Sequence, residues 1–308
     1  MEKTSKYKIS GVVLLLICAL SWGSGFVVLK TAIENTPPVF VIGVRFLIAT
    51  LLLALVFFKK LKLITKKTIL RSLLLGAFLG LAYLVQTLGL KQTTPARNAF
   101  VTSLYCVLCP FFLAVLFKIK PKAQHIVSAV LCVLGILFIS LSSGLGGDVN
   151  MLKGDGLTLV SAVFFALQIV YIDRYKMAED SITLLIVHMF FASVILLLYS
   201  ACFEINAYGI SAFTFSKDNL FNLIYLTLVC TLLAQACQIF GLKWVNPNEG
   251  ALILCLESVF GAIFSLALGK ENLTLLLGIG FVLIFLAVMI SQVNFSPIKK
   301  YSNKNLNK

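Results

Sequence analysis

The chain has 308 residues, of which 60% are apolar or aromatic and 12% are charged, and it carries a net charge of +14 at pH 7. Soluble domains contain about 45–50% apolar and about 25% charged residues, so this chain has too little charge to cover a soluble body of its size. The composition excludes a soluble enzyme, a disordered chain and a secreted disulfide scaffold, and the length is enough for about ten membrane spans with short loops.

Ten apolar segments follow one another along the chain, each about 20 residues long or slightly longer, which suffices to cross a hydrocarbon core of about 30 Å. Because unpaired backbone groups are not tolerated in lipid, we expect helices, and the segments are too long and too continuous for barrel strands. Thr94-Pro95 and Asn246-Pro247 are typical of an N-cap followed by a first-turn proline, and predict where the fourth and ninth helices begin. The expected helices are 9–32, 38–58, 69–90, 95–117, 124–143, 154–174, 181–203, 219–242, 247–269 and 273–293.

Most basic residues lie in the short loops between these segments, which explains the net charge without a nucleic-acid partner. With the N-terminus in the cytoplasm, 19 Lys and Arg residues lie inside, six lie outside and Arg45 lies within a helix. This asymmetry predicts a multi-pass protein of the cell membrane with both termini in the cytoplasm. We expect the basic segment 294–308 to be a poorly ordered cytoplasmic tail in contact with anionic lipid.

The eight cysteines lie within or at the edge of apolar segments, so we expect buried free thiols rather than a disulfide framework. Cys106-x-x-Cys109 has no second cysteine pair and no nearby histidine, and is interpreted as packing rather than as a redox or metal site. The sequence contains no Gly-x4-Gly-Lys-Ser/Thr run for binding ATP phosphates. No metal, no cofactor and no enzymatic activity are predicted.

The second half of the chain repeats the first. With a shift of 152 residues, segment 86–116 falls on segment 238–268 with ten identities. With a shift of 143 residues, the first two expected helices fall on the sixth and seventh, and Arg45 falls on His188. Agreement of this extent indicates a duplication.

Each half contains five expected helices, so the second half must enter the membrane upside down. The predicted fold is an all-α integral membrane protein of ten transmembrane helices, built as two inverted five-helix repeats at 9–143 and 154–293. Inverted repeats recur in secondary transporters, where the substrate site lies near the midplane between the halves.

Three motifs resemble the drug/metabolite transporter superfamily and, within it, the EamA family. Leu20-Ser21-Trp22-Gly23-Ser24-Gly25-Phe26 is similar to the family's tryptophan–glycine signature, and Arg45-Phe46 to its arginine–phenylalanine pattern. Leu256-Glu257-Ser258-Val259-Phe260, followed by Gly269-Lys270-Glu271, is similar to the family's segment that ends in glycine–glutamate and a turn.

The resemblance covers about residues 10–292, with three departures. Ser258 stands where proline is common, Lys270 separates Gly269 from Glu271, and the first half has Lys118-Ile119-Lys120-Pro121 in place of an acidic turn. The resemblance implies ten helices and transport of small metabolites, often export, by a family whose members handle amino acids, sugars, nucleotide derivatives and drugs.

Three ionisable side chains lie within expected helices, where burial costs about 2.5–3.5 kcal/mol on insertion scales and marks functional candidates. Glu257 lies near the midplane, about 15 Å along its helix from Pro247. It is either a proton-coupling or substrate-amine site, or a structural hydrogen-bonding group. Arg45 either binds a substrate carboxylate or pairs with an acid or headgroup. His188, its counterpart in the second half, is either hydrogen-bonded packing or a proton relay.

Uncharged polar and aromatic residues recur at helical spacing on several expected helices and predict one shared cavity, with interhelical hydrogen bonding as the alternative. The expected cavity residues are Trp22, Tyr83, Thr87, Asn98, Thr102, Tyr105, Phe165, Gln168, Thr231, Gln235 and Gln238.

The leading interpretation is a secondary transporter, a permease or exporter that moves a small metabolite by alternating access. An amino acid or a related compound is one candidate substrate, membrane lipid is the expected surrounding partner, and a proton is the candidate coupling ion. An integral-membrane enzyme and a channel remain as alternatives. Such enzymes carry His and Asp clusters near one membrane surface, which a sequence with two histidines does not offer.

Overall fold

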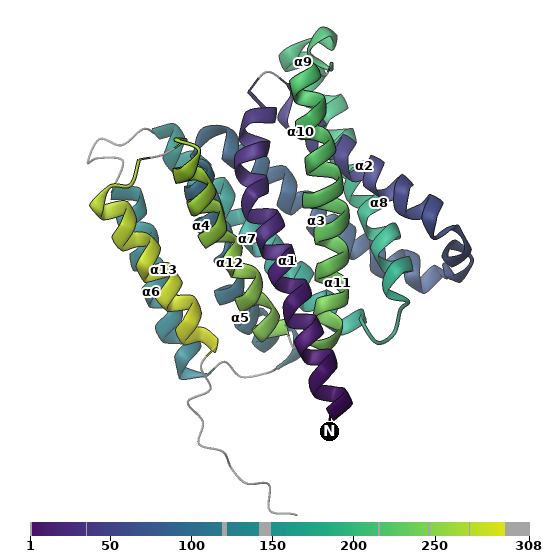
Figure 1. Cartoon of the computed structure of the whole chain (residues 1–308), viewed down its shortest axis with the longest axis horizontal. Helices are drawn as coiled ribbons and strands as arrows, with labels where there is room; N and C mark the ends of the chain where they lie inside the picture. The colour runs from purple at the N-terminus through teal and green to yellow at the C-terminus, as the bar shows by residue number, and fades with distance from the viewer. Residues whose placement is uncertain are drawn as a thin grey trace, which may run out of the picture.

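The computed structural model describes residues 2–34, 36–118, 122–141, 149–214, 216–245, 247–270 and 272–292, and these residues are helical with no strand (Figure 1). The tail at 294–308, Asn246, Glu271 and Ile119-Lys120-Pro121, all of which entered the predictions, lie outside the described residues. The α-helices are α1 Glu2–Ala32, α2 Pro38–Val56, α3 Lys66–Gln92, α4 Pro95–Thr102, α5 Tyr105–Phe117, α6 Ala123–Leu141, α7 Val149–Tyr175, α8 Ser181–Tyr199, α9 Ile205–Tyr208, α10 Lys217–Thr227, α11 Ala234–Trp244, α12 Pro247–Ala267 and α13 Leu275–Gln292. Short 3-10 helices cover Phe58–Leu63 (η1) and Ile210–Ala212 (η3), and π-helical segments cover Ser200–Glu204 (η2) and Leu228–Leu233 (η4).

Within the described residues, seven helical stretches are long and apolar enough to cross a membrane. They are Tyr7–Ala32, Pro38–Val56, Lys66–Gln92, Pro95–Phe117, Val149–Tyr175, Ser181–Tyr208 and Asn219–Trp244. Shorter apolar helical stretches at Ile126–Gly135, Ile253–Ala267 and Leu275–Ala287 fall within the remaining expected segments. The prediction of an all-helical integral membrane protein is confirmed.

The fourth expected helix is interrupted, which the sequence analysis did not predict. α4 ends at Thr102 and α5 begins at Tyr105. At the break, the backbone N–H of Leu104 donates to the carbonyl of Val101 over 3.3 Å, and the Ser103 hydroxyl donates to the carbonyl of Phe100 over 2.7 Å. These three-residue spacings tighten the turn and change the direction of the side chains that follow. The start of α4 is as predicted, because the Thr94 side chain accepts the N–H of Arg97 at 3.4 Å.

The eighth expected helix runs from α10 through the π-helical segment η4 into α11. In this segment the hydroxyl of Thr231 donates to the carbonyl of Leu226, five residues back, over 2.9 Å. A π-helical turn inserts a residue and rotates the helix face that follows, so polar residues spaced evenly in the sequence do not share one face.

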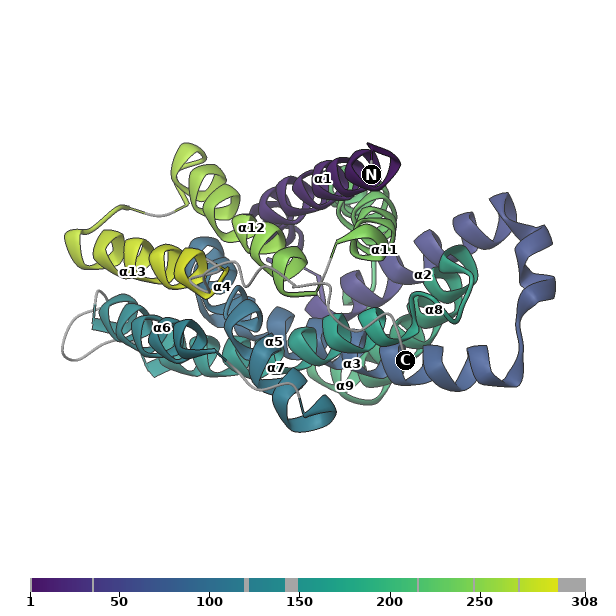
Figure 2. The ribbon, with the colours of Figure 1, turned by 90° about the horizontal axis from the view of Figure 1, so that it is seen from below.

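Seven of the α-helices form two groups, and each group mixes the halves of the chain. α1 packs against α11 and α12, whereas α7 packs against α3, α4 and α5. α2 and α8 pack against each other, and α6 and α13 form a separate pair (Figure 2). We call α1, α11 and α12 the first wall, and α3, α4, α5 and α7 the second wall.

Glycines allow very close approach within each wall. In the first wall, a Cβ on Gly11 would lie 3.1 Å from the carbonyl oxygen of Gly241, and a Cβ on Gly241 would lie 3.1 Å from that of Gly11. In the second wall, a Cβ on Gly89 would lie 2.7 Å from the carbonyl oxygen of Gly154, and a Cβ on Gly154 would lie 2.8 Å from that of Gly89. Any side chain at these positions would push two backbones apart.

A buried ion pair also ties the second wall together. The Arg97 guanidinium on α4 contacts the Asp155 carboxylate on α7, and their side chains are only 3% and 7% exposed. The hydroxyl of Thr93 donates to the same carboxylate over 2.9 Å. Because removing one partner would leave a buried charge uncompensated, this contact keeps α4 and α7 together.

The cysteines are free thiols, as expected. All are buried except Cys202, which is exposed on η2 at the end of α8, so the expectation of burial was wrong for that residue.

Candidate functional site

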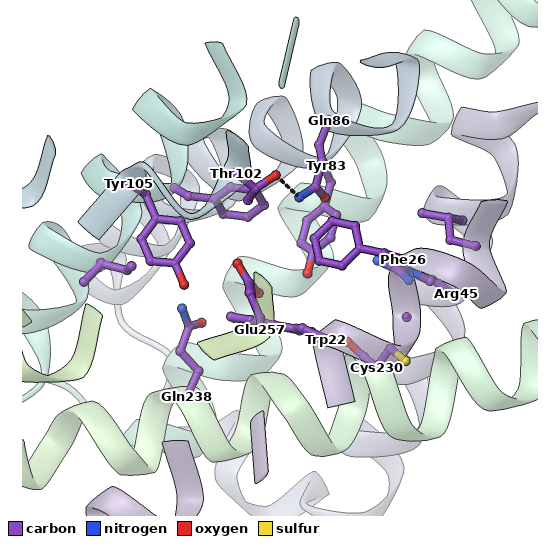
Figure 3. Close-up of a pocket in the computed structure, with 14 residues that line it drawn as sticks. Trp22, Phe26, Arg45, Tyr83, Gln86, Thr102, Tyr105, Cys230, Gln238 and Glu257 are labelled. Carbon is purple, nitrogen blue, oxygen red and sulfur yellow. Dashed lines mark hydrogen bonds between the residues drawn. The ribbon is translucent and has the colours of Figure 1, made fainter. Parts of the chain in front are cut away.

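A cavity lies between the two walls, with α2 and η4 completing its lining (Figure 3). Sites for small molecules combine an apolar lining with a few polar groups, as this cavity does. The lining residues are Trp22, Gly25, Phe26, Leu29, Arg45, Tyr83, Gln86, Thr102, Tyr105, Phe165, Ile169, Cys230, Gln238 and Glu257.

Glu257 is the acidic group of this lining. It lies on α12, in the first wall, and is 3% exposed. Figure 3 shows its carboxylate between the rings of Tyr105 and Tyr83, with the Gln238 amide nearby. The Tyr105 hydroxyl lies beside the carboxylate and makes no other hydrogen bond within the described part of the chain. A carboxylate surrounded by groups that can each donate a hydrogen bond is suited to exchange protons or to hold a cation.

Arg45 is the cationic group of the lining, contributed by α2, and is 3% exposed. Its guanidinium carbon lies 5.1 Å from the centre of the Tyr83 ring and 5.5 Å from that of Phe46. The Arg45 Nε atom makes no hydrogen bond with the described residues. Stacking on two rings holds the guanidinium in place and leaves donor capacity for a carboxylate.

Aromatic rings form much of the remaining lining. The Tyr83 and Phe165 rings meet edge to face with centres 5.2 Å apart, and the Tyr105 and Phe165 centres are 6.3 Å apart. The indole N–H of Trp22 donates to the backbone carbonyl of Cys230 over 3.1 Å, within the first wall. These contacts give rigid apolar faces on both sides of the charged groups.

The structure brings many of the expected cavity residues together. Those found in the lining are Trp22, Tyr83, Thr102, Tyr105, Phe165 and Gln238, with the ionisable residues Arg45 and Glu257. Their role in binding remains a prediction.

The other expected residues lie outside the lining, and two of them, Asn98 and Gln168, bond to neighbouring helices. The Asn98 amide donates to the Thr158 hydroxyl over 2.6 Å, and Thr231 bonds within its own helix. Gln168 and Gln238 exchange reciprocal amide hydrogen bonds of 3.5 and 3.3 Å between α7 and α11. Thr87 and Gln235 are buried, and their side chains make no hydrogen bond with the residues that the structure describes.

His188 is fully buried on α8 and does not line the cavity. Its Nδ1 atom is 2.7 Å from the carbonyl oxygen of Leu184, and the Gln235 amide lies beside the ring. The interpretation as hydrogen-bonded packing therefore fits the observed geometry better than a role in a cavity relay.

Several lining residues were not predicted. Gln86 donates to Thr102 over 3.0 Å and matches Gln238 under the shift of 152 residues, which was an available signal. Phe26, Leu29 and Ile169 are apolar and indistinguishable from packing residues in the sequence. Cys230 lies in the π-helical segment, whose position no sequence pattern indicated.

Comparison with known proteins gives a consistent assignment. The family model described as the EamA-like transporter family matches residues 9–141 and 152–292. An uncharacterized transporter of Archaeoglobus fulgidus is 31% identical over 276 residues, covering 90% of this chain and 83% of the relative. The uncharacterized inner membrane transporter YedA of Escherichia coli is 26% identical over 274 residues, covering 88% of this chain and 87% of the relative. A solved crystal structure has a TM-score of 0.67 at 16% identity, covering 92% of this chain and 96% of that chain, and shares the fold.

Proposed function

This chain belongs to the EamA-like transporter family, as its motifs predicted, and we propose that it is a secondary transporter that moves a small metabolite across the cell membrane by alternating access. The observation that carries the proposal is the cavity that the two walls line together with α2, because each wall takes helices from both halves of the chain. Tilting one wall against the other would open the cavity first to one side of the membrane and then to the other.

We further propose that the apolar helical stretches form ten membrane spans arranged as two inverted repeats, 9–143 and 154–293. The two separate matches to the family model, at 9–141 and 152–292, support this division. The close glycine contacts support the symmetry. Under the shifts of 143 and 152 residues, Gly11 corresponds to Gly154 and Gly241 to Gly89, so the α1–α11 contact has its counterpart in α7–α3.

The proposed substrate carries both an amine and a carboxylate, as an amino acid or a related compound does. Glu257 and Arg45 supply opposite charges within one cavity, and aromatic faces lie between them. A zwitterion would satisfy both buried charges, which are costly to leave unpaired. Glu257 is also the proposed site at which a proton enters or leaves during coupling.

A screen of the purified protein for thermal stabilisation by a metabolite panel tests this assignment. Bound ligand raises apparent stability by mass action, so compounds of one chemical class should raise Tm. The stabilising compounds should then exchange with labelled substrate across proteoliposomes. Stabilisation by compounds that are not transported would contradict the proposal.

The alternatives predict different results in the same vesicles. A channel would give flux far above carrier turnover and no exchange of labelled substrate. An integral-membrane enzyme would return a chemically altered compound. A carrier returns the unaltered compound and shows exchange faster than net flux.

A further inference from the structure

Two lysines join the walls at opposite ends of the cavity. The Lys30 ammonium, near the end of α1, donates to backbone carbonyls at the end of α3: Leu90 at 2.7 Å, Lys91 at 3.1 Å and Thr93 at 2.8 Å. The contact therefore runs from the first wall to the second. Leu29, next to Lys30, and Gln86, one turn before Leu90 on α3, both line the cavity. The lysine contact therefore lies at one end of the cavity.

Lys176 makes the corresponding contact at the other end. It follows α7 in the second wall, and its ammonium donates to the carbonyls of Leu242 at 3.0 Å and Val245 at 3.4 Å, at the end of α11 in the first wall. Gln238, one turn before Leu242, lines the cavity.

The acceptors of the two lysines are equivalent in the repeat. Leu90 falls on Leu242 and Thr93 falls on Val245 under the shift of 152 residues. The donors come from equivalent helices, α1 and α7. The last carbonyls of a helix lack intrahelical partners and carry partial negative charge, so a lysine ammonium is well suited to bind them.

We propose that Lys30 and Lys176 are a pair of latches, each closing one end of the cavity by binding its own wall to a helix terminus of the other wall. Both lysines bind their carbonyl acceptors in this structure. Opening toward one side requires the lysine at that side to release its carbonyls, and both groups then become available to water. The inference rests on the proposed transport function and assigns residues to its gating step.

The two ends are not equally secured. Near the Lys176 end, the reciprocal amide pair of Gln168 and Gln238 also joins the walls. At the other end the equivalent positions are Gly25 and Gln86, and the Gln86 amide instead donates to Thr102 of its own wall. The Lys176 ammonium is also held 2.6 Å from the Asp173 carboxylate. Loss of Lys30 should therefore open the cavity more than loss of Lys176.

Cys230 offers a natural reporter, because it is a free thiol that lines the cavity. In a variant whose other cysteines are replaced by serine or alanine, an impermeant maleimide is applied to right-side-out or to inside-out vesicles. Lys30→Met should raise the rate of Cys230 labelling on the order of tenfold or more, the range expected from loss of charge-assisted hydrogen bonds, and only from the face where α1 ends. Lys176→Met should raise labelling from the opposite face, by a smaller factor.

Matched controls are Lys153→Met and Lys67→Met, which remove exposed lysines at the same two ends. Neither should change labelling. Lys30→Arg and Lys176→Arg keep a charged donor, so Cys230 should be labelled in them at the same rate as with the native lysines. Where a Met variant fails to fold, the corresponding Lys→Gln variant takes its place. Equal labelling of the latch and control variants, or a rise from both faces together, would overturn the proposal.

The labelling result and the transport result separate the two hypotheses. Face-specific labelling without substrate exchange would support the latches and contradict the transporter assignment. Substrate exchange with unchanged labelling in the Lys30 and Lys176 variants would support the transporter and refute the latches.

Discussion

Gly89 and Gly154 approach so closely that a Cβ atom on Gly89 would lie 2.7 Å from the carbonyl oxygen of Gly154. The reverse substitution would place a Cβ 2.8 Å from the carbonyl oxygen of Gly89. The contact joins α3 to α7, and it fixes the spacing of the second wall on one side of the cavity. Small residues in membrane helices allow this kind of backbone contact.

Replacing either glycine with alanine should therefore destabilise the protein. Gly154→Ala should lower the free energy of unfolding by about 1–3 kcal/mol, because the two backbones must separate. Gly156→Ala is the matched control on the same helix, since a Cβ there meets nothing within 4 Å. Thermal unfolding in detergent measures both. A Tm for Gly154→Ala equal to that of Gly156→Ala would contradict the packing argument.

Glu257→Gln should abolish accumulation driven by an imposed pH difference while leaving substrate-for-substrate exchange intact. The amide keeps the size of the side chain but cannot gain or lose a proton. The measurement is uptake of labelled substrate into proteoliposomes with and without a pH gradient. Glu34→Gln, at an exposed carboxylate beside Lys270, is the control and should retain pH-driven uptake. Continued accumulation by the Glu257 variant would remove that residue as the coupling group.

The structure separates two residues that the sequence placed on equal terms. Tyr83 lines the cavity, whereas Gln235 is buried outside the lining. Tyr83→Ala should weaken apparent substrate affinity on the order of tenfold, through loss of an aromatic face and of the stacking on Arg45. Gln235→Ala should leave affinity unchanged, as should Leu276→Ala on an exposed apolar surface. The rise in Tm with ligand concentration gives the apparent affinity of all three variants. An unaltered affinity of the Tyr83→Ala variant would exclude Tyr83 from the substrate site.

Topology is testable with two exposed lysines in the first turns of α3 and α10, the third-helix positions of the two halves. Cysteine at Lys67 should be shielded from an impermeant reagent in intact cells, and cysteine at Lys217 should be labelled. Labelling of both positions would contradict the inverted arrangement. The opposite pattern would place the N-terminus outside.

Asp180 stabilises the start of α8 outside the membrane segments. Partial burial alone would raise the pKa of this carboxyl, but hydrogen bonds from Lys60 at 2.8 Å and from the Thr183 N–H at 3.1 Å outweigh burial and lower it. A lowered folded-state pKa means that the stabilisation is complete above the unfolded value near 3.9 and is lost as pH falls through the folded value. Asp180→Ala should cost about 1 kcal/mol at neutral pH, and the difference from the unmodified protein should shrink as pH falls through the lowered pKa of Asp180. A constant difference across pH would show that the charge is not involved.

The sequence determined where the helices lie, because a run of about 20 apolar residues and a first-turn proline act locally. It also predicted the duplication, since equivalent positions keep equivalent residues, as in the alignment of Leu90 with Leu242. Glu257 and Arg45 were identifiable for the same local reason, that charge inside an apolar helix is costly and must be used or paired.

Only the tertiary structure decided which side chains meet. Thr102 lines the cavity while Asn98, one turn away on the same helix, bonds to Thr158. Gln238 on α11 reaches the cavity, whereas Gln235, three residues earlier on the same helix, does not. Lys30 contacts the end of α3 although Lys30 and its acceptor Leu90 are 60 residues apart in the chain. Helical spacing fixes only relative angles within one helix, whereas the direction a face points is set by breaks, π turns and the packing of helices from both halves.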